Sequence, residues 1–207
     1  MRRFILLFVI FQLSAFAATA QTRVRDLFAS APDSIFPLLT KNNRLDCLDF
    51  KENNMAAKVK NRLEDVAELK ELSADYLFFQ MSAHSSVEMR LLNDSLFCLI
   101  NTYQGPGANS RVRFFSLDWK PVEIKLPSPQ VEDFWNEVPD SLQQTARFAR
   151  QSLEDIRLVR INAQTGEPVL TFTLHTGELV DKEKEVAQQY VHPLRYRWDG
   201  QTFQPIP

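Results

Sequence analysis

Glycine is scarce in this chain of 207 residues, which has only five, at positions 105, 107, 166, 177 and 200. No two of them have the spacing of a phosphate-binding loop, so Walker-type and dinucleotide-binding motifs are excluded. Charge of one sign is not in excess either, because the formal net charge is −2. This balance gives no broad electrostatic reason to expect nucleic-acid binding. The composition, 44% hydrophobic and 24% charged, is that of a folded domain.

Clustered metal ligands are also missing. The three histidines are far apart in the sequence and distant from both cysteines: His84, His175 and His192. Small structural metal sites depend on closer ligand spacing, so we expect neither a metal nor an organic cofactor. Carboxylates leave a weaker trace in a sequence, and a calcium ion would be sought first in the charged segment that contains Asp181, Glu183 and Glu185.

No pattern selects a catalytic group. His84 precedes Ser85 and Ser86, but a nucleophile and its base are defined by spatial geometry, and a G-x-S-x-G motif is absent. Acidic residues occur in several pairs, and no spacing singles out the two facing carboxylates that a glycosidase needs. We therefore favour a non-catalytic protein and keep a carboxylate-dependent hydrolase as the alternative.

The first twenty residues have the three parts of a secretory signal peptide. Two arginines come first, residues 4–16 are almost entirely apolar, and Ala18-Thr19-Ala20 has the small-x-small pattern of a cleavage site. We predict cleavage between Ala20 and Gln21, and hence a periplasmic or secreted protein. The apolar run is shorter than the roughly 20 residues of a spanning helix, and no later segment reaches that length. No membrane span is therefore expected after removal of the signal.

The mature chain, residues 21–207, carries a net charge of −4. Its length suits one hydrophobic core, and we predict a single domain. Cys47 and Cys98 both lie in apolar surroundings. Export permits a disulfide, whereas free cysteines often behave as small buried apolar residues, so both states stay open.

Short helices are predicted at the start of the mature chain, where Val24, Leu27 and Phe28 share a helical face. From about residue 55 the apolar period changes to two, which indicates strands. The expected strands are 55–63, 67–72, 76–82, 87–92, 95–104 and 111–118. Their short connections favour an antiparallel meander, because parallel pairing needs long crossovers.

Helical spacing returns after Ser128-Pro129 and again after Asp140, where Ala146, Ala149 and Leu153 share a face. Four more strands are expected, at 156–162, 168–174, 194–198 and 202–206, and the segment 178–190 is either a short helix or an exposed loop. The predicted fold class is α+β, with an antiparallel meander packed against N-terminal and central helices.

Aromatic side chains are the best candidates for partner binding. Tyr103 precedes the glycine-containing loop 105–110, and Trp119 and Trp198 lie at strand ends beside turns. Such rings stack on sugars or anchor proteins, although they also serve to cover the end of a core. The loop 105–110 is the expected recognition loop. We therefore predict a binding module for an envelope protein or glycan whose identity the sequence does not give.

The sequence also resembles a known family. The similarity runs from residues 24–50 through 94–119, and its marks are Asp26-Leu27-Phe28, Pro32-Asp33-Ser34, Asn43-Arg44-Leu45-Asp46 and the strand pair that ends at Trp119. These segments resemble exported domains of unknown function from gut-type Bacteroidales. The resemblance implies a cell-envelope location in a Gram-negative anaerobe, and it supplies no activity, substrate or site residue.

Overall fold

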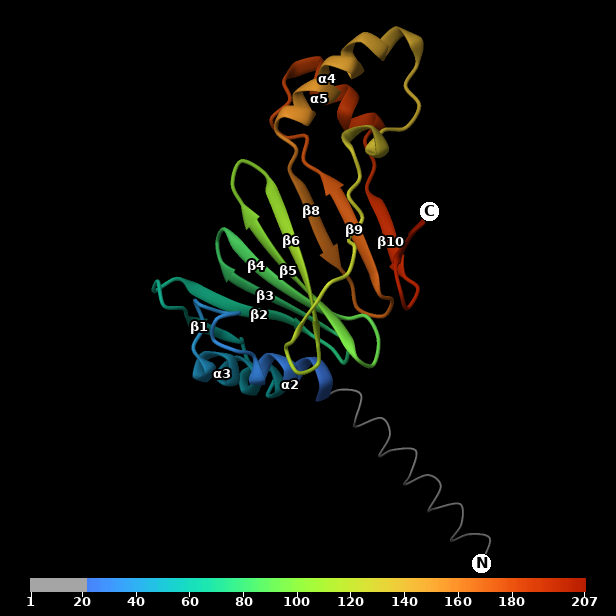
Figure 1. The fold of residues 1–207 in the computed structure, drawn as a ribbon. Helices are drawn as coiled ribbons and strands as arrows, with labels where there is room; N and C mark the ends of the chain where they lie inside the picture. The colour runs from blue at the N-terminus through green and yellow to red at the C-terminus, as the bar shows by residue number, and fades with distance from the viewer. Residues whose placement is uncertain (1–21) are drawn as a thin grey trace, which may run out of the picture.

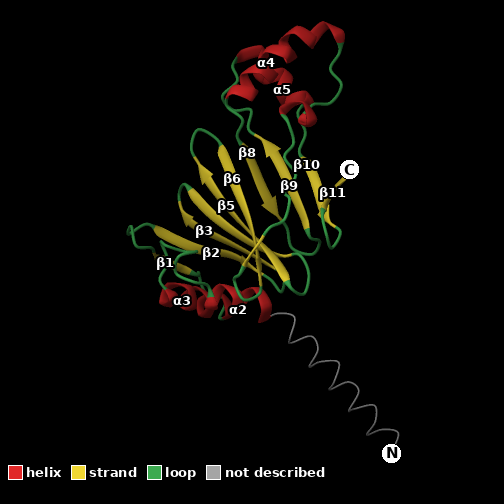
Figure 2. Ribbon diagram, viewed as in Figure 1, coloured by secondary structure: helices red, strands yellow, loops and turns green. Residues whose placement is uncertain are grey.

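The computed structural model describes residues 22–207, which form two antiparallel sheets with helices at both ends (Figure 1; Figure 2). The predicted signal sequence and its cleavage site between Ala20 and Gln21 lie outside these residues. Helices α2 (Thr22–Ser30) and α3 (Lys41–Glu52) cover one face of the larger sheet. Thr40 begins α3 with a capping box, because its side chain accepts from the Asn43 N–H at 3.1 Å.

The larger sheet has seven strands that pair in sequence order, each antiparallel to the next. They are β1 (Lys58–Lys60), β2 (Val66–Leu72), β3 (Tyr76–Ser82), β4 (Ser85–Leu91), β5 (Leu96–Gln104), β6 (Ala108–Ser116) and β7 (Pro121–Val122). The predicted α+β class and the antiparallel meander are confirmed.

Strands β3 and β5 of the meander are buried on both faces, which explains why their sequences are almost continuously apolar. On β3, Leu77 and Phe79 pack beneath α2 and α3. The alternate residues Tyr76 and Phe78 belong to the core on the opposite face. A second sheet covers much of that opposite face.

The second sheet has the strand order β11-β10-β9-β8. Its strands are β8 (Val159–Ala163), β9 (Val169–Leu174), β10 (Leu194–Trp198) and β11 (Phe203–Ile206). Strand β8 lies against β4, β5 and β6 of the meander. The Asp199-Gly200 turn joins β10 to β11, and Gly200 has a φ of 108°, the conformation for which glycine is favoured at this position.

The central helices extend the core between the sheets. They are η1 (Val131–Phe134), η2 (Asp140–Leu142), α4 (Gln143–Asp155) and α5 (Asp181–Tyr190). Helix α4 buries the predicted face of Ala146, Ala149 and Leu153, and it packs on α5 at the far end of the second sheet (Figure 1).

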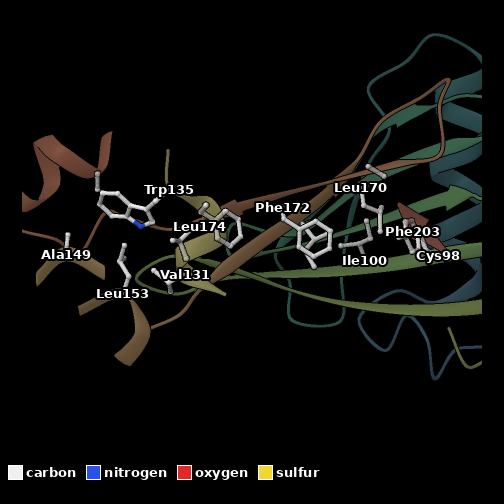
Figure 3. Packing of buried hydrophobic residues seen from close by; sticks show 14 of the residues in the cluster. Cys98, Ile100, Val131, Trp135, Ala149, Leu153, Leu170, Phe172, Leu174 and Phe203 are labelled. Carbon is white, nitrogen blue, oxygen red and sulfur yellow. The ribbon is translucent and has the colours of Figure 1, made fainter. Parts of the chain in front are cut away.

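One apolar cluster connects these helices to the meander. It runs from Leu153 through Phe172 on β9 to Cys98 on β5 (Figure 3). The second sheet therefore stands between the meander and the central helices, an arrangement that the sequence pattern does not specify.

The two cysteines are free and lie on opposite faces of the meander. Cys98 belongs to the core between the sheets, whereas Cys47 lies on α3 and belongs to the core between the N-terminal helices and the meander. The sheet separates the two thiols, so they form no disulfide. Burial raises the pKa of both thiols to about 12, which keeps them protonated.

Strand β8 is an edge strand, and polar side chains of the meander satisfy its backbone. Three of its N–H groups donate hydrogen bonds to these side chains. The bonds are Val159 N–H to Asn109 Oδ1 (3.3 Å), Ile161 N–H to Ser110 Oγ (2.9 Å) and Ala163 N–H to Glu88 Oε2 (2.8 Å). A buried N–H without an acceptor is costly, so these contacts fix where β8 sits on the larger sheet.

Glu88 supplies the one carboxylate among these three contacts, and it has a relative exposure of 2%. Its Oε2 also accepts from the Tyr76 hydroxyl at 3.0 Å. Burial raises the pKa of Glu88 to about 7, because the low-dielectric interior disfavours the charged form more than the two donors favour it.

A buried arginine makes the neighbouring contact between the sheets. Arg90 forms an ion pair with Asp75, in the turn between β2 and β3, and donates to the Gly166 carbonyl at 2.8 Å. The Gly166 N–H donates in turn to Asp75 at 3.1 Å. Partial burial works against ionisation of Asp75, but the bond from Arg90 and its other donors hold its pKa below the usual value. The β8–β9 turn is thereby held against the meander.

Replacing Glu88 with Gln should remove a pH dependence of stability. Between pH 4.5 and about 7 the folded chain holds a proton on Glu88 that the unfolded chain has released. The wild-type free energy of unfolding should therefore fall as the pH rises through this window, by up to about 3 kcal/mol. In E88Q the amide oxygen still accepts from Ala163 and Tyr76, and this part of the slope should vanish.

Urea denaturation at several pH values between about 5 and 8 measures the slope. The matched control is Glu185→Gln, an exposed carboxylate on α5 that should leave the slope unchanged. Identical slopes for wild type and E88Q would contradict the assignment of this proton to Glu88.

Candidate functional site

A groove of about 800 Å³ opens at the β7 edge of the meander. Strand β7 pairs with β6 at only two positions, Phe114 with Val122 and Phe115 with Pro121. The chain then leaves the sheet as the irregular segment 123–127. We name the space between β6 and this segment the edge groove. Its apolar lining includes Ile35, Val112, Trp119, Val122, Ile124 and Leu126.

Unpaired backbone groups border the edge groove. Ser116 donates its N–H to the Lys120 carbonyl at 3.0 Å, so the alternate residues of β6 turn their backbone groups toward β7. In that register Ile124 would face Val112, but the ladder has already ended. No hydrogen bond among residues 22–207 engages the backbone N–H groups of 123–126. Such an edge is a template for another extended segment.

The edge groove also contains a cation that has no counter-ion among residues 22–207. Arg113 lines the groove and donates to Asn101 Oδ1 at 3.2 Å, and its guanidinium lies 5.6 Å from the centre of the Phe115 ring. Its Nε is buried and has no acceptor among the described residues. Burial, and then repulsion from Arg111, lowers the pKa of Arg113. A carboxylate brought by a partner would relieve both costs.

Trp119 forms one wall of the groove and is held firmly. It has a φ of 63°, a conformation that is uncommon for a bulky residue. Its indole N–H donates to the Leu27 carbonyl at 3.2 Å, and its ring packs edge-on against Phe97 at 4.9 Å. These contacts fasten the β6–β7 turn to α2, so this wall of the edge groove is preformed.

The other two aromatic candidates lie elsewhere. Trp198 is 6% exposed and packs against Phe203 at 5.1 Å, which leaves little of its ring for a partner. Tyr103 is 59% exposed and lies six residues beyond Phe97 on β5, about 20 Å along the strand. The structure therefore brings Trp119 to the edge groove without Tyr103 or Trp198.

The loop 105–110 is less exposed than the sequence suggests. Gly107 is buried against the ring of His175, and a Cβ at Gly107 would lie 2.3 Å from that ring. Gly105, by comparison, has open space around it. The close approach of Gly107 holds this loop against the start of the β9–α5 connection, so much of it serves the fold.

The expected turn at His84 joins β3 to β4, and no hydrogen bond among the described residues joins its ring to Ser85 or Ser86. Within residues 22–207, no three His, Cys, Asp or Glu side chains come together as metal ligands. No helix in the same range is long and apolar enough to cross a membrane.

Segment 123–126 is the part of the groove that sequence reasoning missed. Its signal is present as the alternation of Val122, Ile124 and Leu126 with charged residues, which is the pattern of a half-buried strand. The pattern predicts extended backbone, but it does not reveal that the partner strand is missing.

These features define an α+β protein with two antiparallel sheets and a groove at one sheet edge. Residues 15–203 match the model of the family described as "Protein of unknown function (DUF3256)", and the chain belongs to this family. The expected membership of a family of unknown function is confirmed, whereas export stays a prediction.

A solved structure with the same fold comes from Porphyromonas gingivalis W83, where it is a domain of an uncharacterized protein. The TM-score is 0.71, the sequence identity is 23%, and the match covers 89% of this chain and 98% of that chain. The similarity shows a shared fold. No curated protein matches the sequence.

Substitution of Trp119 and Tyr103 compares the contribution of a packed aromatic ring and an exposed one to the stability of the fold. Trp119→Ala should lower the free energy of unfolding by about 3 kcal/mol, because it removes a packed indole. Tyr103→Ala should change it by less than about 0.5 kcal/mol, because that ring is exposed. Urea denaturation followed by circular dichroism measures both. An unchanged stability in the Trp119 variant would show that the indole does not anchor the turn.

Proposed function

We propose that the chain is a non-catalytic binding module of the cell envelope, whose partner is a protein that places an extended, acidic segment in the edge groove. The observation that carries this proposal is the end of the β6–β7 ladder at Phe114 and Val122. Beyond it, the backbone N–H groups of segment 123–126 have no acceptor within the described part of the chain, and they lie beside an apolar wall. An extended peptide supplies the missing hydrogen bonds, and its alternate side chains fill the apolar lining.

The charge of the groove supports an acidic partner. Arg113 has no carboxylate within ion-pair distance among residues 22–207, and the same is true of Lys125, which also lines the groove. Glu123 is the single acidic residue of the lining. A carboxylate beside Arg113 would form a charge-assisted hydrogen bond with a group that is otherwise partly desolvated.

Export to the periplasm or beyond is part of the proposal. We expect the exported protein to have the mass of residues 21–207, because the n-region, apolar run and Ala18-Thr19-Ala20 pattern direct cleavage after Ala20. Intact-mass spectrometry of the protein from an envelope fraction checks this. Ala20→Leu should block processing, since signal peptidase requires a small residue there. A wild-type product that retains residues 1–20 would contradict the prediction.

Partner capture tests the groove itself. Tagged wild-type protein should recover a partner from its own envelope fraction, and Ile124→Asp should reduce recovery at least tenfold, because it places a charge in the apolar lining. Val180→Asp is the matched control: Val180 is a 64% exposed apolar residue that does not line the groove. Equal recovery of the same proteins by wild type and the Ile124 variant would contradict the proposal.

Hydrogen exchange adds a readout that depends on strand pairing. The N–H groups of the alternate residues in 123–126 that face the added segment should exchange more slowly in the captured complex than in the free protein, because that segment accepts from them. Protection that is confined to other surfaces would show that the partner binds outside the edge groove.

The carboxylate-dependent hydrolase stays as a second candidate on one observation. Glu71 and Glu88 line the same pocket between the sheets, away from the edge groove. A general acid needs a proton near neutral pH, and the pKa of Glu88, raised by burial to about 7, meets this condition.

A further inference from the structure

A second pocket opens between the sheets, where β8 leaves the faces of β2 and β3 uncovered. It has a volume of about 370 Å³ and is lined by residues of β2, β3, β4 and β8 and by the turn after β8. A smaller hollow of about 170 Å³ shares Phe78 and Arg160 with it. We name the two together the intersheet pocket. Its size is at the lower end of the roughly 300–1,000 Å³ typical of small-molecule sites.

A buried carboxylate forms the inner end of this pocket. Glu88 is 2% exposed, and both of its hydrogen bonds are made by Oε2, to the Tyr76 hydroxyl and the Ala163 N–H. No described residue donates to Oε1, and Glu88 belongs to the lining of the pocket. Oε1 is not one of the fully buried atoms that lack a partner among the described residues, so it is open to the pocket and can accept from a donor group of a ligand.

The charged groups around Glu88 come from several elements. Glu71 on β2 and Arg160 on β8 act on it with opposite sign, and the Tyr76 hydroxyl and the Cys98 thiol also face it. An anionic ligand would be repelled by Glu71 and Glu88, and a cationic ligand by Arg160. Neutral hydroxyl groups are compatible with the carboxylates and with the arginine, because a hydroxyl donates to a carboxylate and accepts from a guanidinium.

An aromatic ring and neutral polar side chains complete the pocket. Phe78 is half-buried and lines both of its parts. The amides of Asn162 and Gln164 and the hydroxyl of Thr165 lie along the β8 side. The face of a sugar ring is apolar and packs on an aromatic ring, while its edge carries hydroxyls that both donate and accept.

We propose that the intersheet pocket binds a short neutral glycan, with one sugar ring on Phe78 and a hydroxyl that donates to Oε1 of Glu88. Arg160 lines both parts of the pocket and holds the next sugar along the chain. None of these residues lines the edge groove, so this site and the proposed protein site succeed or fail independently.

Sugar titration followed by NMR tests the site. The probes are neutral monosaccharides and β-linked disaccharides of glucose, galactose and N-acetylglucosamine, added to the mature wild-type chain. At least one disaccharide should bind saturably with a millimolar dissociation constant. Arg160→Ala should weaken it at least tenfold and Phe78→Ala should abolish it, whereas Arg195→Ala, an exposed arginine on β10, should leave it unchanged. Because Arg160 is exposed, its variant tests the site even if the Phe78 variant is unstable.

The pH dependence of binding tests the role of Glu88. Its ionised form accepts from the sugar hydroxyl, so the affinity of the wild type should fall several-fold between pH 8 and pH 6, on either side of the pKa of about 7. Glu88→Gln should bind with an affinity that does not change over this range. A pH dependence that persists in E88Q would remove Glu88 from the site.

Two results would overturn the proposal: no saturable binding by any probe at millimolar concentration, or binding that neither Arg160→Ala nor Phe78→Ala weakens. New anomeric signals from a cleaved disaccharide, lost in both variants, would support the sugar site and would assign hydrolysis to the same pocket.

Discussion

The docking of β8 on the meander is the constraint on which the rest of this structure depends. The free side of an edge strand usually pairs with another strand, whereas the free N–H groups of β8 donate to the side chains of Asn109, Ser110 and Glu88. The contact of Val159 is exposed and that of Ile161 is partly buried, whereas that of Ala163 is buried in the core between the two sheets, where an unpaired N–H is expensive and a satisfied one is strong. The meander and the second sheet therefore meet along one defined line, and the central helices are placed by the sheet that this line positions.

Both candidate sites follow from the way the chain passes between the sheets. After Val122 the chain must leave the meander to reach the second sheet, and its departure ends the β6–β7 ladder early and leaves segment 123–126 unpaired. On arrival, β8 covers β4, β5 and β6 but not all of β2 and β3. The uncovered face, where Phe78 lines both hollows, becomes the intersheet pocket.

Local sequence patterns predict the elements of this fold well and their assembly poorly. The strands expected at 76–82 and 194–198 are β3 and β10 residue for residue, and the spacing of Ala146, Ala149 and Leu153 predicts the buried face of α4. These features depend on residues close in sequence, as the periodicities of helices and strands do. The placement of the second sheet instead depends on hydrogen bonds between residues about 50 to 75 positions apart, such as Ile161 with Ser110 and Ala163 with Glu88.

The candidate sites were hidden for the same reason. In the run of β4, polar residues alternate with Val87 and Met89, which is the usual pattern of a strand with one solvated face, yet Glu88 and Arg90 are both buried. A single sequence cannot distinguish a solvated polar face from one that another sheet covers. The aromatic residues were ambiguous in a different way, because a tryptophan beside a turn suits either an exposed contact or a core, and only the position of α2 decides for Trp119.

Glu88 links the docking of the second sheet to the intersheet pocket, since its carboxylate both accepts from β8 and lines the pocket. A ligand hydroxyl on Oε1 favours the ionised carboxylate over the protonated one. An ionised acceptor forms stronger hydrogen bonds, so the bonds that Oε2 receives from Ala163 and Tyr76 strengthen at the same time. Occupation of the pocket and attachment of the second sheet are therefore coupled through the same group, and by linkage a firmer attachment of β8 raises the affinity of the pocket by the same factor.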